Sequence, residues 1–400
     1  MKRLCLVNAK IVIPSGVVDN GYIIIVGTKI AKIGRLDEFE KYEEDIIIDI
    51  IGHTILAGFI DQHVHGGGNA DTMDDTWKAF EKIATVHAAH GTTSMCLTTV
   101  AHSKDKLLKI CQDVKNYSQK MKPNKHAKIL GVHLEGPFMN PAMKGAHQEE
   151  YMVRLNYAEF LDYIAVGEDY LRIITFAPEM LESIDEIRKI SHTKTVLSLG
   201  HTKVDYAGAS LAFEYGVKCV THFFNAMTLF HHRNPGIIGA SLKNPLVKIE
   251  IIPDPNLVHP VSIEMAYQLF GAERIIIITD ALRVAGHNTT KKFVLAGRNL
   301  VVNKDSCYLE DGTIWGSKLT MNEAVRNFIQ ITNCTLVEAS IMASRNSAIL
   351  LGMENKGSVE IGKDADLVVL DERFNVLMTV VEGVVVYSAL HSYMDEKCTN

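Results

Sequence analysis

Apolar runs recur along the middle of the chain, and polar segments with helical spacing separate them. The runs are TILAGFIDQHVH, TTSMCLTTV, KILGVHLEG, LRIITFAPE, KTVLSLGHT, KCVTHFFNAM, VKIEIIPD and RIIIITDA. Segments such as TWKAFEKIATVHAAHG and YAGASLAFEYG predict helices between them. Strands that are apolar on both faces and alternate with helices favour a parallel sheet. Eight such units predict an α/β fold with a closed (β/α)₈ barrel of the TIM type, for which about 250 residues is typical.

An open, doubly wound sheet is the structural alternative to the barrel. Such sheets often bind dinucleotides through a GxGxxG segment that follows the first strand. No GxGxxG opens the first unit of this chain, so nucleotide binding has little support.

Both ends of the chain follow a different pattern, in which short β-branched runs are separated by Gly, Asn and Asp. Residues 1–54 contain LCLVNAKIVIP, YIIIVGTKIAKIG and DIIIDIIGH, and residues 357–400 contain GSVEIGKDADLVVLD and VLMTVVEGVVVYS. Part of 290–315 has the same character. We predict a small β-sandwich domain formed by both chain ends with part of 290–315, beside a barrel domain at 55–356.

Composition excludes several classes of function. Hydrophobic residues make up 47% and charged residues 22% of the chain, as in ordinary globular proteins. The net charge of −6 gives no basic surplus for nucleic acid, so a phosphorylated substrate would need a local cationic site. The seven Cys show no CxxC spacing, which favours a reducing compartment over a disulfide framework. With no convincing signal peptide and no apolar run of about 20 residues, we expect a cytoplasmic protein with no membrane partner.

Ionisable residues fall at the ends of the predicted barrel strands. Each has an ordinary explanation when taken alone: helix cap, salt-bridge partner or hydrogen-bonded packing. Barrel active sites, however, are built at the C-terminal ends of the strands, which all open on one mouth. The joint pattern therefore predicts a metal site in a hydrolase. Its six members are His63 and His65 after the first strand, where Asp61 also falls, Glu135 after the third, His201 after the fifth, His222 after the sixth and Asp280 after the eighth.

These residue types indicate a particular chemistry. Imidazole and carboxylate ligands suit Zn²⁺ and also Fe²⁺, Mn²⁺ or Co²⁺. A bound divalent ion brings the pKa of water towards about 7 and polarises a carbonyl group. An Asp beside that water can accept its proton and deliver it to a leaving amine, which hydrolyses an amide without a covalent intermediate. No GxSxG is present to support a serine hydrolase.

A further set of segments resembles a known family. GFIDQHVHGGG, GVHLEGPF followed by KGAH, SLGHT, VTHFFNAM, HHRNPG, ITDA and GSKLTMNEAVRN are similar to those of N-acetylglucosamine-6-phosphate deacetylases in the amidohydrolase superfamily. The resemblance extends almost end to end and includes the closing GSVEIGKDADLVVLD. It implies deacetylation of N-acetyl-D-glucosamine 6-phosphate to D-glucosamine 6-phosphate and acetate, in amino-sugar catabolism.

The resemblance also implies roles for individual residues. Zn or Fe would be the divalent metal, with one or two ions per subunit. The expected metal ligands are Glu135, His201, His222, His63, His65 and Asp280. Asp280 would be the catalytic acid and base, and His147 of KGAH would assist at the substrate carbonyl. Asn225 and the backbone amide of Ala226 would contact the phosphate, as would Arg233, which in the family reaches across from the partner subunit of a homodimer.

One position departs from the family pattern. The family has a stretch similar to A-D-G-x-H-V-H-P after the seventh strand, and here the sequence is PDPNLVHP. The first His of that stretch, which binds substrate in the family, aligns with Leu257. A Leu side chain donates no hydrogen bond, and a lost contact of this kind costs about 1–3 kcal/mol. Either His259 or a neighbour takes over the contact, or the substrate differs.

Three alternatives stay open at the level of sequence. N-acetylgalactosamine-6-phosphate deacetylases share the metal and phosphate motifs. The two sugars differ only in configuration at C4, and no residue in the sequence can be assigned to the recognition of C4. A cyclic-amide hydrolase has no need of HHRNPG and often uses a carboxylated Lys where this chain has Glu135. A non-catalytic scaffold typically loses metal ligands, whereas all six are present here.

Overall fold

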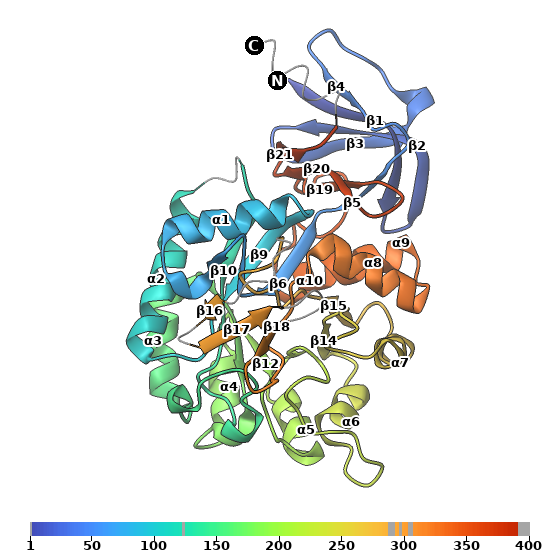
Figure 1. Cartoon of the computed structure of the whole chain (residues 1–400). Helices are drawn as coiled ribbons and strands as arrows, with labels where there is room; N and C mark the ends of the chain where they lie inside the picture. The colour runs from blue at the N-terminus through green and yellow to red at the C-terminus, as the bar shows by residue number, and fades with distance from the viewer. Residues whose placement is uncertain (1, 122–124, 287–292, 296–297, 303–306, 391–400) are drawn as a thin grey trace.

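The computed structural model describes residues 2–121, 125–286, 293–295, 298–302 and 307–390. Eight parallel strands follow one another around a nearly closed barrel in chain order, which confirms the predicted fold class (Figure 1). A backbone bridge between Val64 and Ala281 joins the first strand to the segment after the last one. The barrel strands are β6 (Phe59–Val64), β9 (Thr92–Thr98), β10 (Lys128–Glu135), β11 (Leu171–Phe176), β12 (Val196–Leu199), β13 (Cys219–Val220), β14 (Lys248–Ile251) and β15 (Ile275–Ile277).

Helices cover the outside of the barrel between consecutive strands. The two helices expected from TWKAFEKIATVHAAHG and YAGASLAFEYG are present and begin after side-chain caps, Thr76 and Asp205, which accept a backbone N–H of the first turn. The helices are α1 (Trp77–Ala88), α2 (Lys104–Lys120), α3 (Tyr157–Gly167), α4 (Glu186–Ser191), α5 (Tyr206–Glu214), α6 (Gly236–Lys243), α7 (Pro260–Phe270), α8 (Met321–Thr332), α9 (Leu336–Ser340) and α10 (Asn346–Leu350).

The first predicted strand, TILAGFIDQHVH, is divided between two sheets. Its first part, β5 (Thr54–Ala57), pairs with the sheet of the chain ends, and after Gly58 the chain continues as barrel strand β6. A Cβ at Gly58 would lie 2.1 Å from the Cγ2 atom of Thr93, so only Gly permits the close approach. The small sheet and the barrel therefore share one continuous extended segment.

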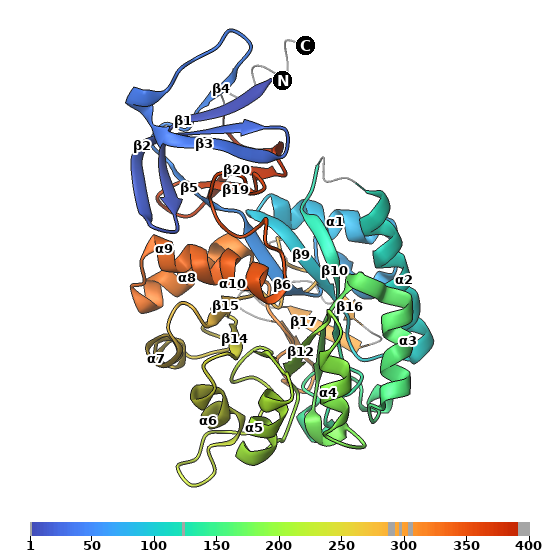
Figure 2. The same ribbon diagram turned by 180° about the vertical axis from the view of Figure 1, so that it is seen from behind.

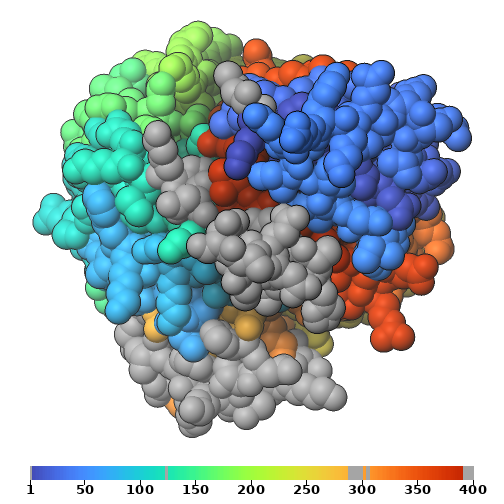
Figure 3. Space-filling view, turned by 90° about the horizontal axis from the view of Figure 1, so that it is seen from above, coloured from blue at the N-terminus to red at the C-terminus, as the bar shows by residue number. Residues whose placement is uncertain are grey.

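The chain ends form one eight-stranded sheet above the barrel (Figures 1 and 2). It encloses an apolar cluster with contributions from both ends, including Ile11, Ile23, Leu367 and Met378. Figure 3 shows the N-terminal and C-terminal segments side by side on one face of the molecule. Besides β5, the strands are β1 (Arg3–Ile13), β2 (Gly16–Val26), β3 (Lys29–Arg35), β4 (Ile46–Asp49), β19 (Leu367–Leu370), β20 (Val376–Val381) and β21 (Val384–Ser388). The domain bounds of 1–54, 357–400 and 55–356 stay a prediction.

A buried ammonium group ties this sheet to the barrel. Lys356 Nζ lies 2.6 Å from Asp366 Oδ2, 3.1 Å from Asp364 Oδ2 and 3.3 Å from Glu382 Oε1. Glu382 also pairs with Lys128 at the start of barrel strand β10. Because a buried charge is costly without partners, this network fixes how the two units meet.

Segment 290–315 was grouped with the chain ends in the sequence prediction. Its described strands, β16 (Phe293–Leu295), β17 (Arg298–Val302) and β18 (Cys307–Leu309), pair with one another as a separate three-stranded sheet. In Figure 1 this sheet lies across the barrel. Val302, Leu309 and Trp315 pack against loops that follow the barrel strands, so the segment contributes a wall to the mouth.

The inside of the barrel changes character along the strands. The deeper layer is apolar and is closed by α10; it contains Ile60, Cys96, Leu130, Ile173, Val196 and Cys219. The next inward-facing positions towards the C-terminal ends of the strands are polar. They lie two residues after those of the apolar layer, or three residues after it on β10, which has a bulge at Gly131. They are Gln62, Thr98, His133, Thr175, Ser198 and Thr221. We call these six residues, together with Glu250 of β14, the polar layer. Within the described residues, no helix is both long and apolar enough to cross a membrane.

Candidate metal centre and its cavity

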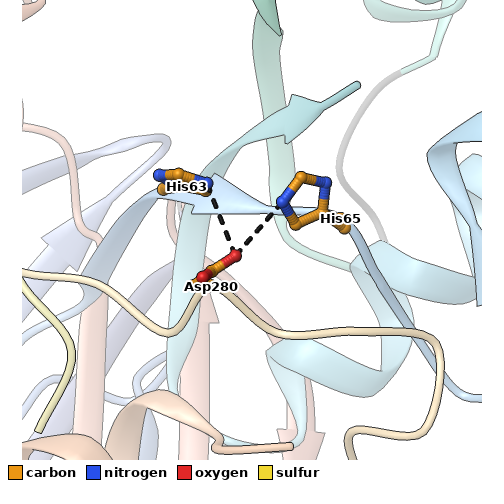
Figure 4. Close-up of side chains that lie close together, drawn as sticks. All are labelled: His63, His65 and Asp280. Atoms are coloured by element: carbon orange, nitrogen blue, oxygen red, sulfur yellow. Dashed lines mark ion pairs between the residues drawn. The ribbon is translucent and has the colours of Figure 1, made fainter. Parts of the chain in front are cut away.

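The six predicted metal-site residues meet at the mouth of the barrel, and all are buried. Glu135 is at their centre: its Oε1 lies 3.1 Å from His222 Nε2 and 3.3 Å from His201 Nε2, and its Oε2 lies 3.2 Å from His65 Nε2. His65 Nε2 also lies 3.1 Å from Asp280 Oδ1. Figure 4 shows His63 and His65, both from the end of β6, converging on the Asp280 carboxylate.

Several of these residues hold their backbone in the left-handed region. The φ angles are 49° at His201, 31° at His222, 48° at Ala226 and 49° at Asp280. Non-glycine residues adopt this region at a cost of about 1–3 kcal/mol each, which the surrounding structure must offset. The Asp280 backbone is held by its N–H, which donates to the His63 carbonyl at 2.9 Å. The sharp turns at the strand ends aim the side chains into the mouth.

Hydrogen bonds on the far side of two rings fix which nitrogen faces the centre. His201 Nδ1 lies 2.8 Å from the Met143 carbonyl oxygen, which only accepts, so Nδ1 carries the proton. His63 Nδ1 lies 3.1 Å from a Glu250 oxygen in the same way. In its neutral form each ring therefore presents an unprotonated Nε2 to the centre, which is the form that binds a metal ion.

His147 has the opposite orientation. The backbone N–H of Ala101 donates to His147 Nδ1 at 3.1 Å, so in the neutral ring the proton is on Nε2. That Nε2 lies 3.5 Å from Glu135 Oε2. Although His147 is close enough to Glu135 and His201 to join a metal-ligand group, its tautomer makes it a hydrogen-bond donor into the cavity.

Electrostatics indicate that the centre suits a cation. Burial disfavours the charged form of Glu135, but the imidazoles around it outweigh burial and lower its pKa well below the usual value. Burial also disfavours imidazolium at His65, yet Asp280 and Glu135 raise the pKa of His65 to about 9. His63 Nε2 has no hydrogen-bond partner among the described residues. Two buried carboxylates beside inward-facing imidazole nitrogens fit a divalent ion.

A cavity of about 290 Å³ opens from this centre. Asn225 and Ala226, predicted to bind phosphate, line it, and the buried Asn225 Nδ2 has no hydrogen-bond partner in the described chain. An unpaired buried amide is costly, which favours a ligand atom at this point. The lining residues are His65, Glu135, Ala142, Met143, Gly145, Ala146, His147, His201, His222, Asn225, Ala226, Leu257, Asp280, Ile314, Trp315 and Gly316.

Leu257 lies in this lining, where the family pattern places a His. His259 does not replace it, because its ring is exposed and its Nδ1 accepts the N–H of Val261 as the cap of α7. Arg233 is exposed on a tight turn closed by a bridge between His231 and Asn234, outside the cavity of its own chain.

Sequence reasoning missed Glu250. It is fully buried on β14 within the apolar run VKIEIIPD, whose pattern predicts only a strand. Burial disfavours its carboxylate, but the hydrogen bonds from His63 and Gln62 and the charges of the His63 and His133 rings together outweigh that effect, so the pKa of Glu250 is lowered. A charged residue in the middle of an otherwise apolar strand was the available signal. The wall formed by Ile314, Trp315 and Gly316 had no comparable signal.

The chain is similar to known proteins over most of its length. The sequence profile of the amidohydrolase family matches residues 54–386. The chain is 32% identical over 384 residues to N-acetylglucosamine-6-phosphate deacetylase of Bacillus subtilis strain 168, covering 96% of each protein. It is 34% identical to N-acetylgalactosamine-6-phosphate deacetylase of Escherichia coli O157:H7, covering 82% of this chain and 86% of the relative. The crystal structure of N-acetylglucosamine-6-phosphate deacetylase from Thermotoga maritima has a TM-score of 0.86 and 33% identity, covering 96% of this chain and 100% of the other.

Proposed function

The chain belongs to the amidohydrolase family, and from that premise we propose that it deacetylates N-acetyl-D-glucosamine 6-phosphate to D-glucosamine 6-phosphate and acetate. The observation that carries the proposal is the cavity whose lining contains both the carboxylate-imidazole centre and the predicted phosphate-binding residues Asn225 and Ala226. A non-catalytic scaffold would not require a buried carboxylate-imidazole centre that opens into a cavity.

In the proposed reaction, each residue acts through the geometry described above. When bound, a divalent ion polarises the amide carbonyl and lowers the pKa of water. Asp280 accepts the proton of the attacking water on a carboxylate oxygen and passes it to the departing amine. His147 donates its Nε2–H to the carbonyl oxygen as negative charge develops there. Asn225 and the Ala226 amide hold the phosphate and so place the acetamido group at the centre.

The ligand set supports a proposal about the metal. Glu135, His201 and His222 would hold one ion, and His63 and His65 would help to hold a second, with Glu135 between them. Four imidazoles whose Nε2 atoms lie 3.1–3.5 Å from one shared carboxylate suit Zn²⁺ or Fe²⁺.

A side-by-side assay of two epimeric substrates tests the function. We expect metal-dependent acetate release from N-acetylglucosamine 6-phosphate, with kcat/KM about fivefold or more above that for N-acetylgalactosamine 6-phosphate, since one hydrogen bond is worth about 1 kcal/mol. The similarity to the E. coli N-acetylgalactosamine-6-phosphate deacetylase makes the second substrate the relevant competitor. The unphosphorylated sugar is the control. A preference for the galactosamine epimer would overturn the assignment of substrate while leaving the deacetylation in place.

We further propose a homodimer in which Arg233 binds the substrate phosphate of the partner subunit. Arg233 lies outside its own cavity, on a loop that projects beside α6 (Figure 1). The preceding residues Leu229 and Phe230 are 83% and 59% exposed, and Leu246 after α6 is 84% exposed. Large apolar side chains with this exposure near Arg233 in the sequence favour an interaction surface.

Replacing Arg233 with Ala is expected to lower kcat/KM by about 10- to 100-fold, mainly through KM, because a charged hydrogen bond to phosphate is worth about 1.5–3 kcal/mol. Mixed dimers of Arg233→Ala and Asp280→Asn chains decide whether the contact crosses subunits. If Arg233 acts on the partner's site, one of the two sites in each mixed dimer contains both an intact Arg233 and an intact Asp280. Mixing the two variants then restores activity. If Arg233 acts within its own chain, every mixed dimer stays impaired.

A further inference from the structure

The polar layer beneath the metal centre is unusual for this type of barrel, in which branched apolar residues normally fill the interior. Four of its members, Ser198, Thr221, Thr175 and His133, form a chain of hydrogen bonds with one another. Ser198 Oγ lies 2.6 Å from Thr221 Oγ1, which lies 2.7 Å from Thr175 Oγ1, and Thr175 lies 2.7 Å from His133 Nε2. Glu250 is the one carboxylate in this layer.

Glu250 accepts three hydrogen bonds and is fully buried. Gln62 Nε2 donates to its Oε1 at 2.7 Å, and the His222 backbone N–H donates to its Oε2 at 3.2 Å. His63 Nδ1 lies 3.1 Å from the same Oε2. Because an ionised carboxylate only accepts, the proton on the His63 ring must be on Nδ1.

The hydrogen bonds that His63 and His133 already make exclude a separate metal ion within the polar layer. His63, His133 and Glu250 lie close enough together to be considered as a metal-ligand group. His133 Nδ1, however, lies 3.2 Å from the backbone carbonyl of Gln62 and must donate to it, while its Nε2 faces the Thr175 hydroxyl. His63 Nδ1 is committed to Glu250. The cluster therefore supports the centre above it and does not form a centre of its own.

We propose that Glu250 is a positioning residue for the metal centre: it holds His63 in the Nδ1–H tautomer and aims His63 Nε2 at Glu135 and Asp280. It also secures the His222 backbone, at the left-handed turn that directs the His222 side chain to the same place. This inference rests on the proposed metal-dependent function. Groups that orient a metal-binding His in this way typically change metal affinity by about 10- to 100-fold when replaced.

Two substitutions of Glu250 separate its possible contributions. Glu250→Leu removes the acceptor and the charge while keeping much of the volume. Glu250→Gln removes the charge and keeps one acceptor oxygen. Gln62 Oε1 has no partner in the described structure. In the Glu250→Gln variant the Gln62 amide can therefore rotate so that its Oε1 accepts a hydrogen bond from the new side-chain NH₂ group. The new side-chain carbonyl oxygen then remains free to accept from His63. Glu186→Gln is the matched control, since Glu186 is a buried carboxylate that accepts the Tyr157 N–H away from the cavity.

The test measures binding of Co²⁺ to metal-free protein by competition with a chelator, together with its visible absorption spectrum and the thermal melting of the metal-free chain. We expect Glu186→Gln to bind as the wild type does, Glu250→Gln to bind more weakly, and Glu250→Leu to bind one Co²⁺ about 10- to 100-fold more weakly with an altered spectrum. Melting identifies a variant that fails to fold.

Wild-type Co²⁺ affinity and spectrum in folded Glu250→Leu would overturn the proposal. If that variant does not fold, Glu250→Met, which likewise removes the carboxylate acceptor, decides: Co²⁺ affinity and spectrum equal to those of Glu186→Gln in folded Glu250→Met overturn the proposal equally. Because the readout is metal binding, absence of deacetylase activity in the wild-type protein would contradict the proposed function without touching this result.

Discussion

Asp280→Asn is expected to lower kcat for acetate release by about 10²- to 10⁴-fold, the range over which a positioned acid-base group accelerates a reaction. Asn has nearly the shape of Asp and can keep the backbone hydrogen bond to His63, but its amide cannot accept and release a proton at neutral pH. KM should change much less than kcat, because the substrate contacts are assigned to other residues. Steady-state kinetics on N-acetylglucosamine 6-phosphate measure both.

Metal content must be measured in the same samples, because Asp280 Oδ1 also lies near His65 and His63. Asp205→Asn is the matched control: Asp205 caps α5, and Asn caps helices equally well. A metal-loaded Asp280→Asn enzyme that kept more than about a tenth of the wild-type kcat would assign the proton transfer to another group.

Glu135→Gln is expected to remove both metal binding and activity, the latter by about 10³-fold or more, since metal ions contribute several kcal/mol to such reactions. The reason is the central position of Glu135, whose two oxygens face imidazoles from three different strands. An amide offers one acceptor and places an N–H group towards the remaining ring. Elemental analysis and the acetate assay report the two effects.

Chelation of the wild-type protein provides the comparison. Removal of the metal should produce the same loss of activity, and re-addition of Zn²⁺ or Fe²⁺ should restore the wild type but not the variant. Full activity in thoroughly metal-free wild-type protein would contradict a metal-dependent reaction.

The barrel was predictable because its signal is local. Every apolar run between Thr92 and Ala281 became a barrel strand, and the helices between them followed the expected spacing. Placement of His201, His222 and Asp280 at one mouth follows from topology, since parallel strands bring their C-terminal ends together. Their roles in metal binding and proton transfer stay predictions.

What the sequence could not supply depends on distances across the barrel. Glu250 is separated from His63 by 187 positions, and its apolar neighbours predict only a buried strand. The division of the first strand at Gly58 depends on which sheet lies beside each half. Leu257 was recognised as a departure, but only the structure places it in the cavity wall and shows that His259 caps a helix instead.

The continuous segment from β5 to β6 has a consequence for the newly made chain. β5 pairs with β19, which lies more than 300 residues later, so the small sheet stays incomplete until the ribosome has made nearly all of the protein. At about 5–20 residues per second this takes roughly 15 s to a minute. Throughout that time β6, at the end of which His63 and His65 lie, is continuous with a strand of an incomplete sheet. We therefore expect the metal centre to form only at the end of synthesis. Binding of the metal would then require translation of the C-terminal strands as well as the presence of the ligands.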